Sequence, residues 1–173
     1  MDTPAPDAKH LGLPLTTARL LYPFPAQEEK KLKEIARILL GLPGQPLAAY
    51  FHNPFAPPPL PPALRVAGHD LHVLTEPEHV TAALAHTEAE ETLLFPLAGF
   101  SLEELGIRMK KARKWWKLTP PGYAHEFVGI EGLSGPFVFH GPSHESLAVY
   151  GPREQLEPLS QALEPLLGPQ SQG

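Results

Sequence analysis

Cysteine is absent from this chain of 173 residues, which also contains only one asparagine and two methionines. Without cysteine, a disulfide framework, a zinc ribbon and a thiol nucleophile are excluded, and any metal site would need histidines and carboxylates. The scarcity of labile residues, together with 23 prolines, resembles the composition of thermophilic proteins. A GC-rich genome would produce much of the same bias.

Long apolar runs are also lacking. None approaches the length of a membrane span, and the first ten residues, MDTPAPDAKH, lack the cationic and apolar regions of a signal peptide. We therefore expect a cytosolic protein that has no membrane segment. The hydrophobic fraction of 42% is sufficient for a globular domain with its own core.

Familiar catalytic motifs are missing as well. The sequence has no glycine-rich phosphate loop, no nucleophile elbow and no HExxH pattern. Ser134 and Ser143 lie in predicted turns, and no motif around them marks a nucleophile. The sequence thus indicates no catalytic residue, no cofactor and no metal site, and it favours a non-enzymatic protein over an enzyme.

The most informative stretch is residues 92–117, TLLFPLAGFSLEELGIRMKKARKWWK, which reads as a strand followed by a helix. Ser101 and Glu104 have the spacing of a capping box, which predicts a helix that begins near Leu102. Apolar residues then recur at steps of four, three and four, which is the spacing of one buried helix face. This apolar stripe consists of Leu105, Met109, Ala112 and Trp116.

Six cations occupy the rest of this predicted helix, and no acid follows Glu104 within it. They are Arg108, Lys110, Lys111, Arg113, Lys114 and Lys117. Subtracting these six cations from the net charge of −5 leaves −11 for the remainder of the chain, so charge is strongly segregated. A purely structural explanation exists, because acids at the start of a helix and cations at its end stabilise the helix dipole.

A binding function is the other explanation of this helix. Trp115 lies about 100° from Trp116 around a helix, on the cationic side, where an exposed tryptophan would serve as an interface anchor or a stacking platform. The candidate binding residues are Arg108, Lys110, Lys111, Arg113, Lys114, Trp115 and Lys117. We rank a solvated face first, an acidic protein partner second and nucleic acid third, because the rest of the chain is acidic. The leading functional prediction is a non-enzymatic cytosolic binding or adaptor module, and a nucleic-acid-associated protein is the alternative.

Periodicity and turn residues predict an α+β fold along the whole chain. Strands are expected at 18–24, 47–51, 64–66, 71–75, 92–97, 126–130, 136–140 and 147–150, and helices at 25–40, 75–86, 101–117 and 151–167. Thr75 and Glu78 form a second capping box before the second helix. We expect a mostly antiparallel sheet, or two small sheets, with the four helices packed to one side. A single domain would span 17–168, with a flexible arm at 1–16 and a tail at 169–173.

An internal duplication is suggested by the order strand, helix, three strands, helix, which occurs over about 18–86 and again over 92–167. LLYPF at 20–24 corresponds to LLFPL at 93–97 in this alignment. Chance is the competing explanation, because leucine, proline and alanine are abundant in this chain. If the duplication is real, only the second copy of the first helix has become basic.

Nine histidines raise a third possibility, a small His-dependent enzyme or metal protein. Its candidate residues are His125, His140, His144 and Glu145, which would meet at one edge of the sheet. The other histidines include His69 and His72 around a predicted hairpin, and His79 and His86 on the second helix. Surface histidines are the simpler expectation for all of them.

Overall fold

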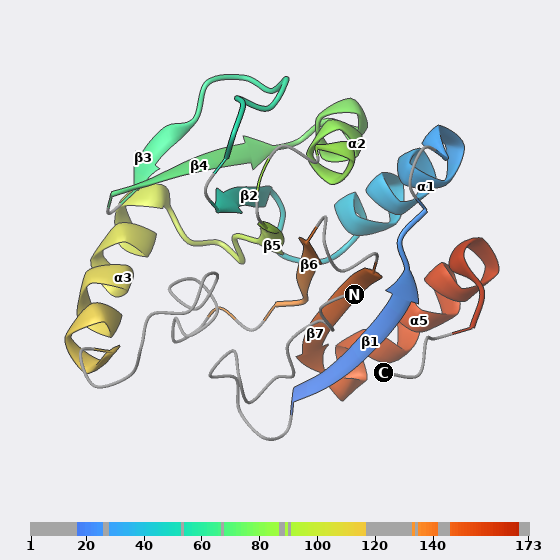
Figure 1. Cartoon of the computed structure of the whole chain (residues 1–173). Helices are drawn as coiled ribbons and strands as arrows, with labels where there is room; N and C mark the ends of the chain where they lie inside the picture. Colours follow the sequence, from blue (N-terminus) through green and yellow to red (C-terminus); the bar gives the residue numbers. More distant parts are fainter. Residues whose placement is uncertain are drawn as a thin grey trace.

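A computed structural model describes residues 17–25, 28–52, 54–66, 68–86, 89, 91–116, 133, 135–141 and 146–169. Within these residues the strands are β1 (Thr17–Pro23), β2 (Leu47–His52), β3 (Leu64–Val66), β4 (His69–Leu74), β5 (Glu91–Pro96), β6 (Phe137–Gly141) and β7 (Ser146–Pro152). The helices are α1 (Glu29–Leu40), α2 (Pro77–Ala85), α3 (Leu102–Trp116) and α5 (Arg153–Leu167). The predicted α+β class is confirmed (Figure 1).

The described strands form one sheet in the order β1-β7-β6-β5-β2-β4-β3, with every neighbouring pair antiparallel. β5 lies in the middle, where its register pairs Leu93 with Tyr50 of β2 and with Phe139 of β6. Residues 92–96 of this strand are all buried. A continuous apolar strand is expected to be covered on both faces, and β5 has that environment.

Helices cover both faces of the sheet, and the expectation that all four pack to one side is wrong. Along β2, Leu47, Ala49 and Phe51 join a core cluster with α1, α2 and α5. The alternate residues Ala48 and Tyr50 join a second core cluster with α3. Successive strand residues point to opposite faces, and both faces of β2 are apolar, so each of them requires a cover. Figure 1 shows α3 on the other side of the sheet from α1, α2 and α5.

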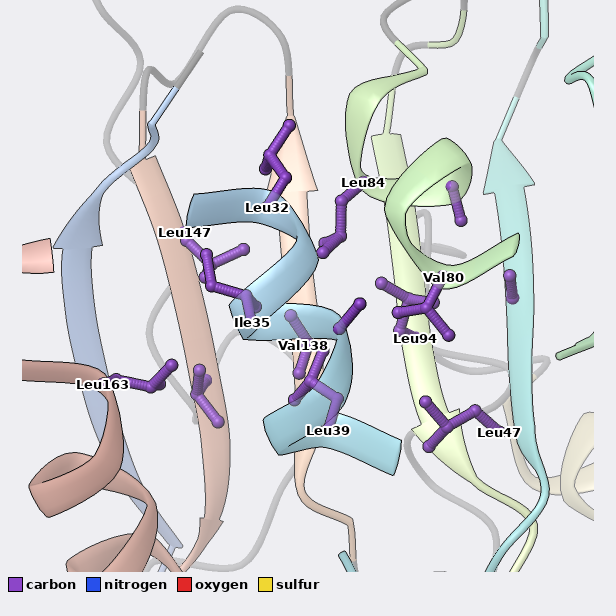
Figure 2. Packing of buried hydrophobic residues seen from close by; sticks show 14 of the residues in the cluster. Leu32, Ile35, Leu39, Leu47, Val80, Leu84, Leu94, Val138, Leu147 and Leu163 are labelled. Carbon is purple, nitrogen blue, oxygen red and sulfur yellow. The ribbon is translucent and has the colours of Figure 1, made fainter. Parts of the chain in front are cut away.

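On the face of the sheet that α1 covers, the core is packed by an apolar stripe along this helix. Leu32, Ile35 and Leu39 point from α1 toward the sheet, where Figure 2 shows them beside Val138 and Leu147. The outer side of α1 carries ion pairs within the helix. These are Lys31 with Glu28 at 3.1 Å, Lys33 with Glu29 at 3.4 Å, and Arg37 with Glu34. Three of the four cations of this helix are thus paired locally, and each exposed pair contributes about 0.3–0.5 kcal/mol.

The second helix begins later than its sequence predicts. Glu76, not Thr75, is the N-cap of α2, and no side chain bonds to the cap. Pro77 occupies the first turn, where its fixed φ and missing N–H suit a helix start. Because the residue before a proline is kept extended, Glu76 has φ −107° and ψ 140°. The proline therefore sets the boundary of α2, and the predicted capping box is wrong.

The internal duplication is not confirmed. β1 lies at one edge of the sheet, whereas its proposed counterpart β5 is central. The helices that follow them, α1 and α3, cover opposite faces. The strand predicted at 126–130 lies outside the described residues, so the second unit cannot be compared with the first element by element.

Tyr22 makes the stability of the folded protein depend on pH in the alkaline range. Burial raises the pKa of this phenol above its ordinary value of 10.0, the Ser160 hydroxyl offsets part of the rise, and the Glu164 carboxylate adds to it. The folded state therefore keeps a proton that the unfolded chain loses, so stability falls as pH increases above about 10. The variant Tyr22→Phe should show a smaller loss of urea resistance between about pH 8 and pH 11 than the natural protein. Equal losses in both proteins would contradict this assignment.

Candidate binding surface on helix α3

The start of α3 is fixed by a turn that packs on the loop between α1 and β2. The backbone N–H of Leu97 donates to the carbonyl of Pro46, and that of Ala98 donates to the carbonyl of Gly44, each at 2.9 Å. Ala98 has a φ of 54°, and Gly44 has a φ of +91°. A Cβ atom at Gly44 would lie 3.1 Å from the Cα atom of Ala98, so glycine permits this close approach. Two distant segments together set where the helix begins.

Ser101 caps α3 as the sequence predicts. Its hydroxyl accepts a hydrogen bond from the backbone N–H of Glu104 at 3.1 Å. The backbone N–H of Leu105 donates to the carbonyl of Ser101 at 2.9 Å, which is the first bond of the helix. Glu103 and Glu104 place acidic side chains in the first turn, near the positive end of the helix dipole.

The first half of the predicted apolar stripe is buried. Leu105 and Met109 pack in the core cluster that also contains Phe95 and Phe139. The stripe was also predicted to include Ala112 and Trp116, whose side chains lie outside the described part of α3. Ile107 lies off the stripe and is 50% exposed, which is unusual for a large β-branched residue.

Arg108 is the one predicted binding residue whose side chain the structure describes. Its guanidinium lies 3.5 Å from the Glu104 carboxylate, and its central carbon lies 4.9 Å from the centre of the Phe100 ring. This cation is therefore engaged with its own helix and with the turn before it. A cation–π contact at an exposed site contributes about 0.5–1 kcal/mol. Arg108 helps to hold the helix start in place, a role that the sequence does not predict.

The other predicted binding residues follow Arg108 in the chain. Five of them lie on successive turns of the α3 backbone, with side chains outside the described part of the structure: Lys110, Lys111, Arg113, Lys114 and Trp115. Lys117 lies outside the described residues altogether. None of the five cations in this group, which are residues 110, 111, 113, 114 and 117, has an acid three or four positions away in the sequence. On α1, by contrast, acids at that spacing pair with Lys31, Lys33 and Arg37.

Exposed apolar side chains accompany the cationic helix. α3 contacts the edge strand β3, whose Leu64 is 52% exposed. Together with Ile107, Leu64 places large apolar groups on the outside of two adjoining elements. Neither exposed side chain was predicted from the sequence. The exposure of Ile107 could have been predicted, because this isoleucine lies between the apolar stripe and the cations in the sequence.

The histidines divide into buried and partly exposed groups, so the expectation of surface histidines throughout is wrong. His140 is only 2% exposed, and it stacks on Phe24 with 3.7 Å between ring centres and 18° between planes. Its Nδ1–H donates to the carbonyl of Ser146 at 3.1 Å, because a carbonyl oxygen can only accept. His140 therefore has a packing role. The predicted partners His125, His144 and Glu145 lie outside the described residues.

Two more histidines hold the proline-rich connection at 54–63. His86 donates through Nε2–H to the carbonyl of Ala56 at 3.2 Å, and His72 donates through Nδ1–H to the carbonyl of Pro61 at 3.1 Å. Both imidazoles also meet the ring of Phe51 edge to face. These histidines attach the connection to the sheet. In the part of the chain that is described, no group of three or more His, Asp or Glu side chains could hold a metal ion.

No protein-family model, no curated protein and no solved structure matches this chain. Among the described helices, none is long and apolar enough to cross a membrane.

Proposed function

We propose that the protein is a non-enzymatic binding module whose α3 helix binds an acidic protein partner. The observation that carries this proposal is the contrast between two helices of one molecule. Three cations of α1, Lys31, Lys33 and Arg37, are balanced by ion pairs with nearby acids. Four cations of α3, by contrast, have no acid three or four positions away in the sequence: Lys110, Lys111, Arg113 and Lys114. An acidic partner would supply the missing counter-charges.

Energetics favour a partner that also contacts apolar groups. An isolated exposed ion pair contributes about 0–1 kcal/mol, so a few such pairs alone bind weakly. Covering the exposed half of Ile107 would add roughly 1 kcal/mol at the usual value for apolar area. Leu64 on β3 offers a similar gain. A protein surface that combines carboxylates with apolar side chains matches this composition.

Nucleic acid is the second candidate, because Trp115 lies among the same cations. A base could stack on this ring while phosphates pair with the lysines. The net charge of −11 on the rest of the chain would oppose a polyanion as long as a nucleic acid. A short acidic segment of a protein avoids most of that repulsion, which is why we place it first.

The test uses the two tryptophans, Trp115 and Trp116, as fluorescent reporters on α3. The protein is titrated with a short poly-L-glutamate and with a single-stranded oligonucleotide several times as long, at about 50 mM and about 300 mM salt. We expect a saturable change with poly-L-glutamate that weakens at the higher salt, and weaker binding of the oligonucleotide. Tighter binding of the oligonucleotide would replace the proposal with the nucleic-acid function. No response to either polymer would contradict both.

A further inference from the structure

The outer side of α5 carries an acidic stripe. This helix buries Leu156, Leu159 and Leu163 against the sheet. Glu154, Glu157, Gln161 and Glu164 are all exposed, and they follow one another at steps of three, four and three. That spacing places them along one face of a helix. Arg153 is the sole cation of α5, at its first residue.

The second half of α3 has the opposite charge. In α3, Ile107 is followed by Lys110 and Lys114 at steps of three and four, with Lys111 beside them in the sequence. The two helices thus carry opposite charge, and this charge complementarity is what favours a contact between them.

One molecule cannot make this pairing within itself. The buried residues of α3 belong to the core cluster on one face of the sheet, and those of α5 belong to the cluster on the other face. Figure 1 shows the two helices on opposite sides of the molecule. Contact between them therefore requires two copies of the chain. Each such contact leaves one α3 and one α5 uncovered at the ends of the pair.

We propose that α3 of one copy docks on α5 of a second copy, with Lys110, Lys111 and Lys114 facing Glu154 and Glu157. This inference rests on the proposed function, because it takes α3 as a surface for acidic protein groups. The contact is heterologous, so it generates an open head-to-tail assembly instead of a closed dimer. Each copy has a net charge of −5, but this long-range repulsion is screened beyond about 10 Å at 0.1 M salt, whereas close pairs persist.

Sedimentation of the full chain tests the assembly directly. At about 50 mM salt, the average mass should increase with protein concentration and pass the mass of a dimer, and at about 500 mM salt it should return to that of the monomer. The monomer mass is 18.9 kDa. A monomer at every concentration at the lower salt would overturn the inference. So would a mass that stops at the dimer.

Charge-reversed variants identify the surfaces. The first variant combines Lys110→Glu, Lys111→Glu and Lys114→Glu, and the second combines Glu154→Lys and Glu157→Lys. Each alone should remain monomeric at about 50 mM salt, and an equal mixture should assemble again, because each variant then complements the other. Assembly of either variant alone would overturn the proposed contact. A control with Lys30→Glu, Lys31→Glu and Lys33→Glu on α1 should assemble like the natural protein.

The failure of the α3–α5 contact can be distinguished from the failure of the proposed function. Binding of poly-L-glutamate by a chain that stays monomeric would overturn only the α3–α5 contact, and would leave a different acidic protein as the partner of α3. Assembly that resists both sets of charge reversal would place the self-contact elsewhere and would also overturn it. Absence of both assembly and polyglutamate binding would contradict the two proposals together.

Discussion

Replacement of Gly135 by alanine is expected to destabilise the protein by roughly 3 kcal/mol or more. Gly135 has a φ of +87°, in the left-handed region. An added Cβ would lie 2.9 Å from the backbone nitrogen of Phe137 and 3.1 Å from the carbonyl oxygen of Tyr150. Phe137 and Tyr150 are paired between β6 and β7, so neither backbone atom can retreat without disturbing the sheet.

Two other glycines separate the effect of φ from the effect of crowding. Gly99 and Gly168 have φ of +83° and +82°, and nothing lies within 4 Å of a Cβ built on either of them. Alanine at these positions should cost only the strain of a positive φ, about 1–3 kcal/mol, with Gly168 at the upper end because its ψ is −175°. Urea unfolding of the three variants measures the difference. Equal losses at the three glycines would show that the crowding around Gly135 has no energetic weight.

His140→Ala is expected to reduce the free energy of unfolding by about 3 kcal/mol. The substitution removes a buried ring stacked on Phe24 and leaves the Ser146 carbonyl without its imidazole donor. The matched variant His79→Ala, at a half-buried position on α2, should change stability by less than about 1 kcal/mol. Denaturant unfolding checks both. If His140→Ala proves as mild as His79→Ala, the packing role of this histidine is wrong.

Local sequence patterns predict most helices and strands of the described chain, but they do not predict how these elements are arranged in space. The periodicity over 25–40 predicts a helix and the apolar run at 92–97 predicts a strand, and both are confirmed as α1 and β5. The side of the sheet that each helix covers could not be predicted. Strands β2 and β5 are apolar on both faces, so alternation gives no preferred face, and the choice is made by contacts between distant segments.

The candidate surface shows the same limit at the level of side chains. The Ser101 cap and the burial of Leu105 depend on neighbours within one helical turn, so the sequence predicts them. The contact of Arg108 with Phe100 depends on the left-handed turn at Ala98, which in turn rests on the loop at Gly44. No local pattern encodes that arrangement.

The prediction that all histidines lie on the surface is wrong for the same reason. The stack of His140 on Phe24 joins β6 to the segment that follows β1, more than a hundred positions earlier in the chain. His86 likewise reaches a carbonyl thirty positions away, at Ala56. Sequence spacing alone therefore assigns such residues to the surface, because their partners lie far away in the chain.

We propose that α3 binds acidic protein groups because Lys110, Lys111, Arg113 and Lys114 have no acid three or four positions away in the sequence, and matched charge reversal is the sharpest test of this binding. Affinity for poly-L-glutamate is measured by equilibrium titration for two triple variants, one with lysines 110, 111 and 114 changed to glutamate and one with lysines 30, 31 and 33 changed likewise. Both variants change the net charge equally, so long-range electrostatics are the same. We predict that the α3 variant loses more than about tenfold in affinity, whereas the α1 variant stays within about threefold of the natural protein. Equal losses in the two variants would show that binding follows net charge alone and that α3 is not the binding surface.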